Sequence, residues 1–105
     1  MGFIEPLKTG FTIYSKSGCP DCRKAKELLN VENDIQIINC DEYLLEDKEE
    51  FLNYIKEKTK GVECRTFPMI FYGEEFIGGL KKLQIYYEEY RSKKFLDDSF
   101  ENTDF

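Results

Sequence analysis

The segment Cys19–Cys22 (Cys-Pro-Asp-Cys) follows closely on the apolar run Phe11–Tyr14, and this adjacency constrains the fold most. The run is aromatic and β-branched and leads into a polar turn, which predicts a short strand. Pro20 suits the first position of a helix, and Asp21 suits the first turn because its charge complements the helix dipole. We therefore expect a strand that turns directly into a helix, with both cysteines at the start of that helix.

Further along the chain, apolar runs predict strands, and apolar residues at helical spacing predict helices. Ile35–Ile38 predicts a second strand, buried on both faces because the run is almost continuously apolar. Met69–Tyr72 predicts a third strand, which Gly73-Glu74 turns into a hairpin with Glu75–Ile77. Helical spacing predicts three helices, which start at Pro20, at about Leu44 and at Leu80. The second ends near Lys58 and the third near Arg91, and the expected apolar stripe of the second is Leu45, Phe51, Leu52 and Ile55.

The predicted order of elements is β-α-β-α-β-β-α. A β-α-β start implies a right-handed crossover between parallel strands, and the closing hairpin adds antiparallel pairing. The expected fold class is therefore α/β, a three-layer sandwich with a four-stranded mixed sheet between helices. At 105 residues the chain has room for one domain. We assign residues 1–92 to it and residues 93–105 to an acidic C-terminal tail.

Composition excludes several classes of function. The formal net charge of −6 argues against binding to nucleic acid or to an anionic membrane. The absence of histidine excludes Ser-His-Asp and Cys-His catalysis and Cys₂His₂ zinc sites. No signal-like start and no membrane-length apolar stretch is present, so we expect a cytoplasmic monomer whose thiols are kept reduced.

The cysteine pair carries the predicted chemistry. Unpaired backbone N–H groups at a helix start favour the thiolate form of a nearby cysteine, which is the nucleophilic form. Cys19 is therefore the expected nucleophile, and Cys22, one turn inside the helix, the resolving thiol. The cations Lys16, Arg23 and Lys24 would stabilise the thiolate and attract substrate carboxylates, whereas Asp21 opposes them. The alternative is an inert or metal-binding pair.

Three further features lie outside the pair. Pro68 in Thr66-Phe67-Pro68 marks a strand start, since proline lacks the N–H that a sheet interior needs. A cis bond there would turn the Phe67 backbone outward to pair with an extended peptide, and an ordinary trans bond is the alternative. Cys40 is expected to be a buried small hydrophobe. Cys64, two residues before Thr66, is either inert or a modifiable loop thiol.

Three segments together resemble the glutaredoxin family: Lys16–Cys22, Arg65–Pro68 and Phe76–Gly79. They occur in family order and at roughly family spacing, and the resemblance covers about Gly10 to Tyr90. It implies a thioredoxin-like fold, a cis peptide bond before Pro68 and glutathione as cosubstrate, with no metal expected. The implied partners are glutathione and disulfide-bearing or glutathionylated proteins.

The resemblance also implies roles for individual residues. Cys19 would be the nucleophile and Cys22 the resolving cysteine of a dithiol enzyme. Lys16 and Arg65 would hold the glycine carboxylate of glutathione, and the Phe67 backbone would pair with its cysteine. The remaining residues implied to bind the cosubstrate are Thr66, Pro68, Gly78 and Gly79.

Two departures from the family pattern leave more than one function open. Asp21 stands where the family often has an aromatic residue, and Leu80-Lys81 stands where it commonly has a small residue and an aspartate that binds the glutamyl amine. The second departure favours a dithiol reductase supplied by a thioredoxin reductase and indifferent to glutathione. The sequence is also compatible with a dimer that binds an iron–sulfur cluster through Cys19 and glutathione, and with a non-catalytic adaptor.

Overall fold

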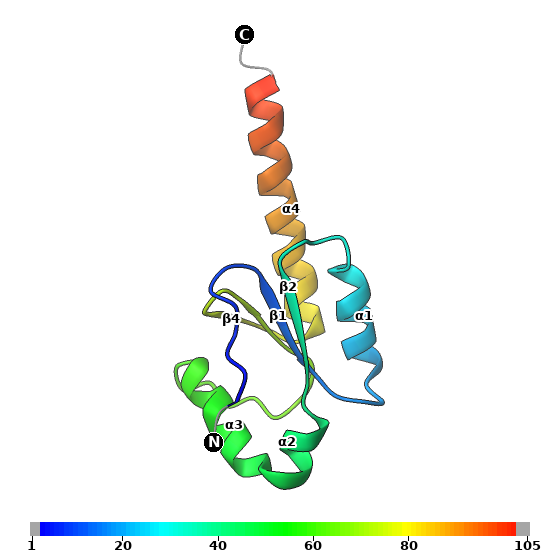
Figure 1. Ribbon diagram of the computed structural model, residues 1–105. Helices are drawn as coiled ribbons and strands as arrows, with labels where there is room; N and C mark the ends of the chain where they lie inside the picture. The colour runs from blue at the N-terminus through cyan, green and yellow to red at the C-terminus, as the bar shows by residue number, and fades with distance from the viewer. Residues whose placement is uncertain (1–2, 103–105) are drawn as a thin grey trace.

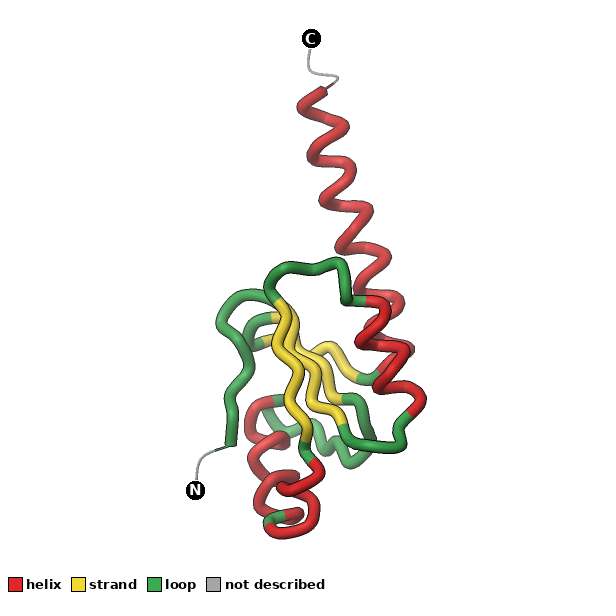
Figure 2. Tube along the Cα trace, turned by 45° about the vertical axis from the view of Figure 1, so that its right-hand side comes forward, coloured by secondary structure: helices red, strands yellow, loops and turns green. Residues whose placement is uncertain are grey.

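Four strands form one mixed sheet (Figures 1 and 2), and the computed structural model describes residues 3–102, with side chains to residue 93. The strands are β1 (Phe11–Ser15), β2 (Ile35–Asn39), β3 (Met69–Tyr72) and β4 (Glu75–Gly78), in the order β2-β1-β3-β4. β1 pairs with β2 in parallel and with β3 antiparallel, and β3 pairs antiparallel with β4. The predicted four-stranded mixed sheet is confirmed.

Helices cover both faces of this sheet. They are α1 (Pro20–Leu28), α2 (Asp41–Glu46), α3 (Lys48–Lys58) and α4 (Leu80–Asn102). In Figure 1, α1 and the first part of α4 lie together on one face, and α2 and α3 lie at the other side of the sheet. The result is the predicted three-layer α/β sandwich of the thioredoxin-like type.

Alternation along the two central strands divides the core in two. Phe11, Ile13 and Ile70 point to one face, where they pack with Leu29 of the α1 end and Leu83 of α4. Tyr14, Met69 and Phe71 point to the other face, where they pack with Phe51, Leu52 and Ile55 of α3. Since side chains alternate across a strand, the buried pattern of β1 and β3 fixes both helical layers.

The single helix predicted from about Leu44 to Lys58 is wrong, because the structure has two helices there. α2 begins earlier, at Asp41, whose N–H donates to the Asn39 side chain at 2.9 Å. Asp47 then leaves helical geometry at φ −136° and ψ 44°, so α3 has a new direction. Leu45 consequently lies outside the core at 85% exposure, while the other three predicted stripe residues are buried.

Burial of the second strand on both faces is also wrong. Only Ile38 of β2 is buried, and Ile37 is 48% exposed. The reason is the strand order, which places β2 at the edge of the sheet. An apolar run alone does not show whether a strand is central or at an edge.

The last helix continues past its predicted end near Arg91, as far as Asn102. The sequence predicts an end near Arg91 because apolar periodicity fades after Tyr90. The predicted boundary between residues 92 and 93 therefore falls inside a continuous helix, and the division into domain and tail stays a prediction. Residues 103–105 of that tail lie outside the described residues. No described helix combines the length and hydrophobicity needed to cross a membrane.

Two apolar residues of α4 provide a matched test of the core. Leu83 is fully buried, whereas Ile85 is 62% exposed. Leu83→Ala should lower the free energy of unfolding by about 2–5 kcal/mol, because it removes buried contacts and leaves a cavity. Ile85→Ala should change it by no more than about 0.5 kcal/mol. Urea unfolding under reducing conditions measures both, and equal losses would contradict this packing of α4.

Candidate active site

Cys19 occupies the capping position of α1. Its backbone is extended, at φ −116° and ψ 103°, and its Sγ accepts a hydrogen bond from the Cys22 N–H at 3.2 Å. Pro20 follows at the start of the helix and Asp21 lies in the first turn, as the sequence predicts. The sulfur therefore lies where a polar capping side chain commonly lies, facing unpaired N–H groups that stabilise negative charge.

The two sulfurs of the pair differ in environment. Cys19 is partly exposed, whereas Cys22 is 1% exposed. Burial raises the pKa of the Cys22 thiol to about 11, and its hydrogen bond with Cys19 acts in the same direction. Cys22 therefore keeps its proton at neutral pH, and Cys19 is the sulfur of the pair that an incoming disulfide can reach.

The loop before Cys19 is tied to the start of α2. The Ser17 N–H donates to Asp41 Oδ1 at 3.0 Å, and the Ser17 hydroxyl donates to Asp41 Oδ2 at 2.5 Å. These hydrogen bonds lower the pKa of the Asp41 carboxyl. Gly18 completes the loop with φ +68°, a conformation that glycine adopts without strain. The Asp41 carboxylate thus holds the loop two residues before the nucleophile.

Asp41 is not among the site residues that the sequence predicts. The signal that could have found it is the pairing of β1 with β2. These parallel strands end in register with Ser15 opposite Asn39, so the residues two positions further on, Ser17 and Asp41, lie side by side. The carboxyl ends of parallel strands meet at one edge of a sheet, which makes this edge the natural place for a site.

The Thr66–Pro68 segment lies against the nucleophile. The Phe67–Pro68 bond is cis, as the resemblance implies, and the Cys19 thiol donates to the Phe67 carbonyl oxygen at 3.6 Å. The Phe67 ring stacks on Phe51 with 6.4 Å between centroids. Lys16 Nζ lies 5.6 Å from the centroid of the Phe67 ring. The structure therefore brings Lys16, Phe67 and Pro68 together beside Cys19.

The two glycines before α4 border the same segment. A Cβ atom on Gly79 would lie 3.6 Å from the Pro68 carbonyl oxygen. Gly78 has φ +132°, and a Cβ atom there would come within 2.9 Å of Lys82 Cβ. The chain needs glycine at this position both for its conformation and for the close approach of the lysine.

Arg65 and Thr66 are exposed at the edge of this region. Arg65 forms ion pairs with Glu49 at 3.1 Å and with Glu63 at 3.6 Å, partners that the sequence did not predict. Because all three side chains are largely exposed, each pair contributes at most about 1 kcal/mol. Arg65 can therefore exchange these partners for the carboxylate of a ligand at small cost.

The remaining two cysteines are placed differently. Cys40 is fully buried, as predicted, and burial raises its pKa to about 12. Cys64 is partly buried, lies 3.6 Å from the Thr66 carbonyl oxygen, and has a pKa raised by burial. All four cysteines are free. Within the described range, no group of three or more His, Cys, Asp and Glu residues could hold a metal ion.

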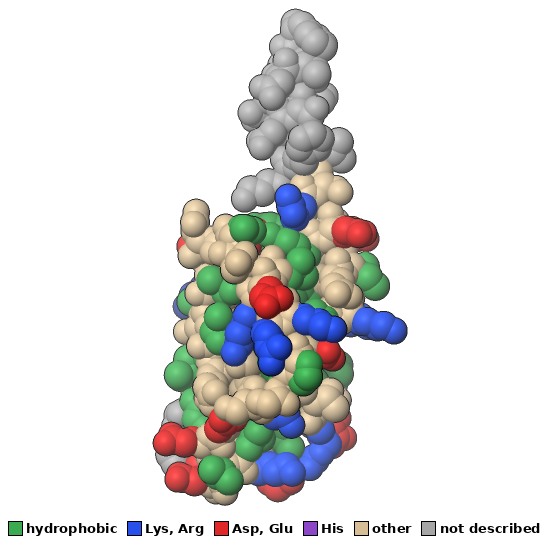
Figure 3. Space-filling view, turned by 90° about the vertical axis from the view of Figure 1, so that its right-hand side faces the viewer, with side chains coloured by type: hydrophobic (Ala, Val, Ile, Leu, Met, Phe, Trp, Pro, Cys, Tyr) green, Lys and Arg blue, Asp and Glu red, His purple; other side chains and the backbone are tan. Residues whose placement is uncertain are grey.

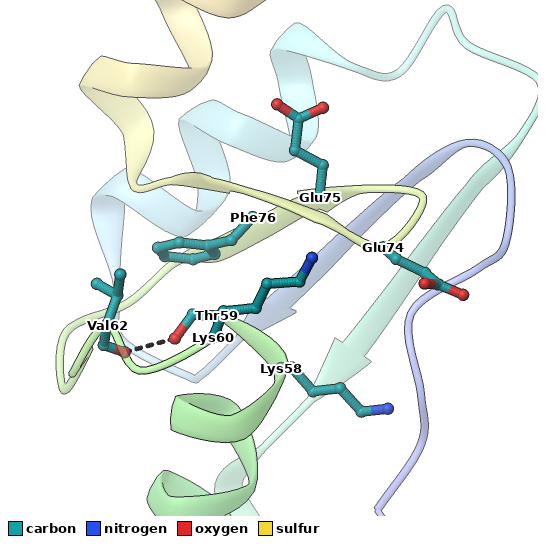
Figure 4. A pocket seen from close by; sticks show the side chains of 7 residues that line it. All are labelled: Lys58, Thr59, Lys60, Val62, Glu74, Glu75 and Phe76. Atoms are coloured by element: carbon teal, nitrogen blue, oxygen red, sulfur yellow. Dashed lines mark hydrogen bonds between the residues drawn. The ribbon is translucent and has the colours of Figure 1, made fainter.

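A surface hollow of about 400 Å³ lies between the end of α3 and β4 (Figure 4). The Thr59 hydroxyl donates to the Val62 carbonyl oxygen on one side of it. Lysines from the α3 end and glutamates from the β3–β4 turn share its lining, and it contains no cysteine. None of the predicted site residues lines this hollow.

Comparison with known proteins gives one family. The family model described as Glutaredoxin matches residues 11–77, which is more than half of the chain. No curated protein sequence matched. Among solved structures, glutaredoxin 1 of Francisella tularensis is 25% identical with a TM-score of 0.64, covering 79% of this chain and 96% of its own.

Two more solved structures are similar. A dithiolic glutaredoxin of Trypanosoma brucei brucei is 29% identical with a TM-score of 0.61, covering 77% of this chain and 79% of its own. A buckwheat glutaredoxin, crystallised as its glutathione complex, is 25% identical with a TM-score of 0.60, covering 83% and 73%. The fold, the family model and the placement of the cysteine pair therefore agree.

The difference between the two sulfurs predicts selective alkylation. With limiting iodoacetamide at pH 7, Cys19 should be labelled first, because Cys22 and Cys40 are buried and their raised pKa values of about 11 and 12 keep them protonated. Peptide mass mapping locates the label, and the urea-unfolded chain, in which all four cysteines are accessible, is the control. Labelling of Cys22 or Cys40 as fast as Cys19 would contradict the described burial.

The contact between Asp41 and Ser17 predicts that removal of the Asp41 carboxylate makes the position of the Cys19 loop less precise. Asp41→Ala should slow the reaction of Cys19 with a small disulfide by about tenfold, because Ser17 loses its anchor and the sulfur is less well placed. Glu42→Ala, which removes the neighbouring acid of the same helix turn, is the matched control and should have little effect.

The pH dependence of this contact follows from the lowered pKa of Asp41. The contact is fully present above the ordinary carboxyl range and is lost only as pH falls through the lowered value. Wild-type reactivity near neutral pH should therefore show no step attributable to Asp41. Equal rates for Asp41→Ala and Glu42→Ala would refute the anchoring role.

Proposed function

Because the chain belongs to the glutaredoxin family, it is a thiol–disulfide oxidoreductase, and we propose that it is a dithiol enzyme that uses glutathione as cosubstrate. Its substrates would be protein disulfides and protein–glutathione mixed disulfides. The observation that carries the proposal is the pairing of a partly exposed Cys19 sulfur at the start of α1 with a buried Cys22 behind it.

The one-cysteine route uses Cys19 alone. The Cys19 thiolate attacks the glutathione sulfur of a mixed disulfide, a new bond forms between these sulfurs, and the protein thiolate leaves and takes a proton from water. A second glutathione then attacks the glutathionyl sulfur on Cys19. Glutathione disulfide leaves, and Cys19 returns to its starting state.

The two-cysteine route reduces a protein disulfide. Cys19 forms a mixed disulfide with the substrate, and Cys22 loses its proton and attacks the Cys19 sulfur. The substrate leaves as a dithiol, and the Cys19–Cys22 disulfide holds the two oxidising equivalents. The 3.2 Å contact between Cys22 N and Cys19 Sγ keeps the two residues adjacent. Two glutathione molecules then reduce the pair.

The proposed binding residues for glutathione surround Cys19. Lys16 and Arg65 would hold the glycine carboxylate, the Phe67 backbone beside Pro68 would pair with the cysteine, and Gly78-Gly79 would admit the glutamyl end, with Thr66 at the rim. The Phe67 carbonyl at 3.6 Å from Cys19 Sγ supports this arrangement. The glutathione complex of the buckwheat glutaredoxin is a precedent in a similar protein.

A second candidate function has one observation in its favour. α4 has no acidic residue in its first turn, where Lys81 and Lys82 lie instead, so nothing there would attract the glutamyl ammonium group. A dithiol reductase supplied by a thioredoxin reductase needs no such group. In either case we propose that the protein is a monomer. We also propose that it works in the cytoplasm, because the four free thiols suit a reducing compartment.

Substitution of each cysteine tests the proposed routes. Cys19→Ser should reduce both deglutathionylation and disulfide reduction to the uncatalysed background, because Cys22 and Cys40 are buried and burial raises the pKa of the partly buried Cys64. Cys22→Ser should keep deglutathionylation and lose reduction of protein disulfides. Activity of Cys19→Ser with either substrate would contradict the assignment of the nucleophile.

The source of electrons separates the two candidate functions. We expect turnover with glutathione and glutathione reductase to exceed turnover with a thioredoxin reductase, measured by NADPH oxidation with the same protein disulfide. The Cys19→Ser variant is the blank in both assays. Turnover with the thioredoxin reductase alone would favour the second candidate.

A further inference from the structure

The start of α4 carries charge of the sign that its own helix dipole disfavours. Lys81 and Lys82 follow the N-terminal residue of this helix, and its first turn has no acidic residue. The three preceding helices all have acids in their first turns, as the dipole favours. Helix stability therefore does not account for this pair of lysines, and their position relative to Cys19 becomes relevant.

A short series of contacts leads from Cys19 to this pair. The Cys19 sulfur contacts the Phe67 carbonyl oxygen at 3.6 Å, and the carbonyl of the next residue, Pro68, lies against Gly79. Gly79 accepts the first hydrogen bond of α4, from Leu83. Lys82 packs its aliphatic stem against Gly78. The two lysines thus lie at the start of α4, next to the Gly78-Gly79 segment that borders Pro68.

Further cations come from α1 and its preceding loop, which carry Cys19 itself. Lys16, Arg23 and Lys24 are exposed, as are Lys81 and Lys82, and we call these five residues the cationic rim. Between residues 3 and 93, the ion pairs found involve only Lys58 and Arg65 as cations, so the rim has none. Figure 3, which views the α1 side, shows several Lys and Arg side chains on this face, with Asp and Glu side chains among them.

This local excess of positive charge contrasts with the whole chain, whose formal net charge is −6. Two acids interrupt the rim: Asp21 lies next to the nucleophile, and the Asp41 carboxylate lies near Lys16. The residues of the rim come from two helices and a loop. The rim is therefore broader than the binding of a single carboxylate requires. Exposed lysines act over a distance of about 8–10 Å at ordinary salt, which suits the steering of a flexible, negatively charged partner.

We propose that the cationic rim selects protein substrates in which acidic residues flank the reactive disulfide. This inference rests on the proposed function of Cys19. The rim brings cations from α1, its preceding loop and the start of α4 to the region of the Phe67 backbone, with which an extended substrate segment would pair. The selection acts on association, so it falls as ionic strength rises.

The experiment uses the full chain in its reduced form and follows a single turnover. No glutathione is then needed as reductant, so its charge does not affect the comparison of rates. Two peptides carry the same mixed disulfide, one flanked by Asp and Glu and the other by Lys and Arg. A small uncharged disulfide is the third substrate. At low salt the wild-type chain should react with the acidic peptide about tenfold faster than with the basic peptide, and high salt should remove this preference.

Charge variants identify the residues responsible. Lys81→Glu/Lys82→Glu should abolish or reverse the preference, and Lys81→Gln/Lys82→Gln should reduce it. Lys8→Glu/Lys56→Glu changes the net charge equally at exposed positions outside the rim and should leave the preference within about twofold of wild type. Circular dichroism confirms that each variant is folded.

The outcomes separate the two proposals. Equal rates with both peptides at low salt, together with reaction of the uncharged disulfide, would overturn the rim and leave the role of Cys19 intact. A preference that survives high salt or the Lys81→Glu/Lys82→Glu change would also overturn the rim. Failure of Cys19 to react with any of the three disulfides would overturn the proposed function itself.

Discussion

The hydrogen bond from the Cys22 N–H to the Cys19 sulfur is the contact on which the rest of the site depends. It places the sulfur at the N-terminal end of α1, where backbone dipoles favour negative charge. The same geometry buries the Cys22 side chain under the first turn and raises its pKa to about 11. One local arrangement thus gives two chemically different thiols, an accessible one that attacks and a protonated one held in reserve.

The sheet positions the segments that surround the Cys19 sulfur. β1 and β3 are the central strands, and their ends deliver the Cys19 loop and the Phe67–Pro68 bond to the same edge. The parallel pairing of β1 with β2 adds Asp41, which holds the loop through Ser17. Three segments distant in sequence therefore meet around one sulfur because strand order and register bring them there.

Features set by local pattern could be predicted from the sequence. The start of α1, the hairpin of β3 and β4, and the pairing of an exposed with a buried cysteine all follow from residues within a few positions of one another. Features set by tertiary placement could not. The exposure of Ile37 depends on β2 being an edge strand, the break at Asp47 on the direction of α3, and the Asp41 anchor on register between strands. The ion pair of Arg65 with Glu49 of α3 likewise joins separate segments.

The central claim is that the Cys19 sulfur alone receives the substrate sulfur. The most direct measurement treats the Cys22→Ser variant with glutathione disulfide and maps the adduct by mass spectrometry of its peptides. The account predicts one glutathionyl group, on the peptide that contains Cys19, with Cys40 and Cys64 unmodified. An adduct on Cys64, or none on Cys19, would contradict it.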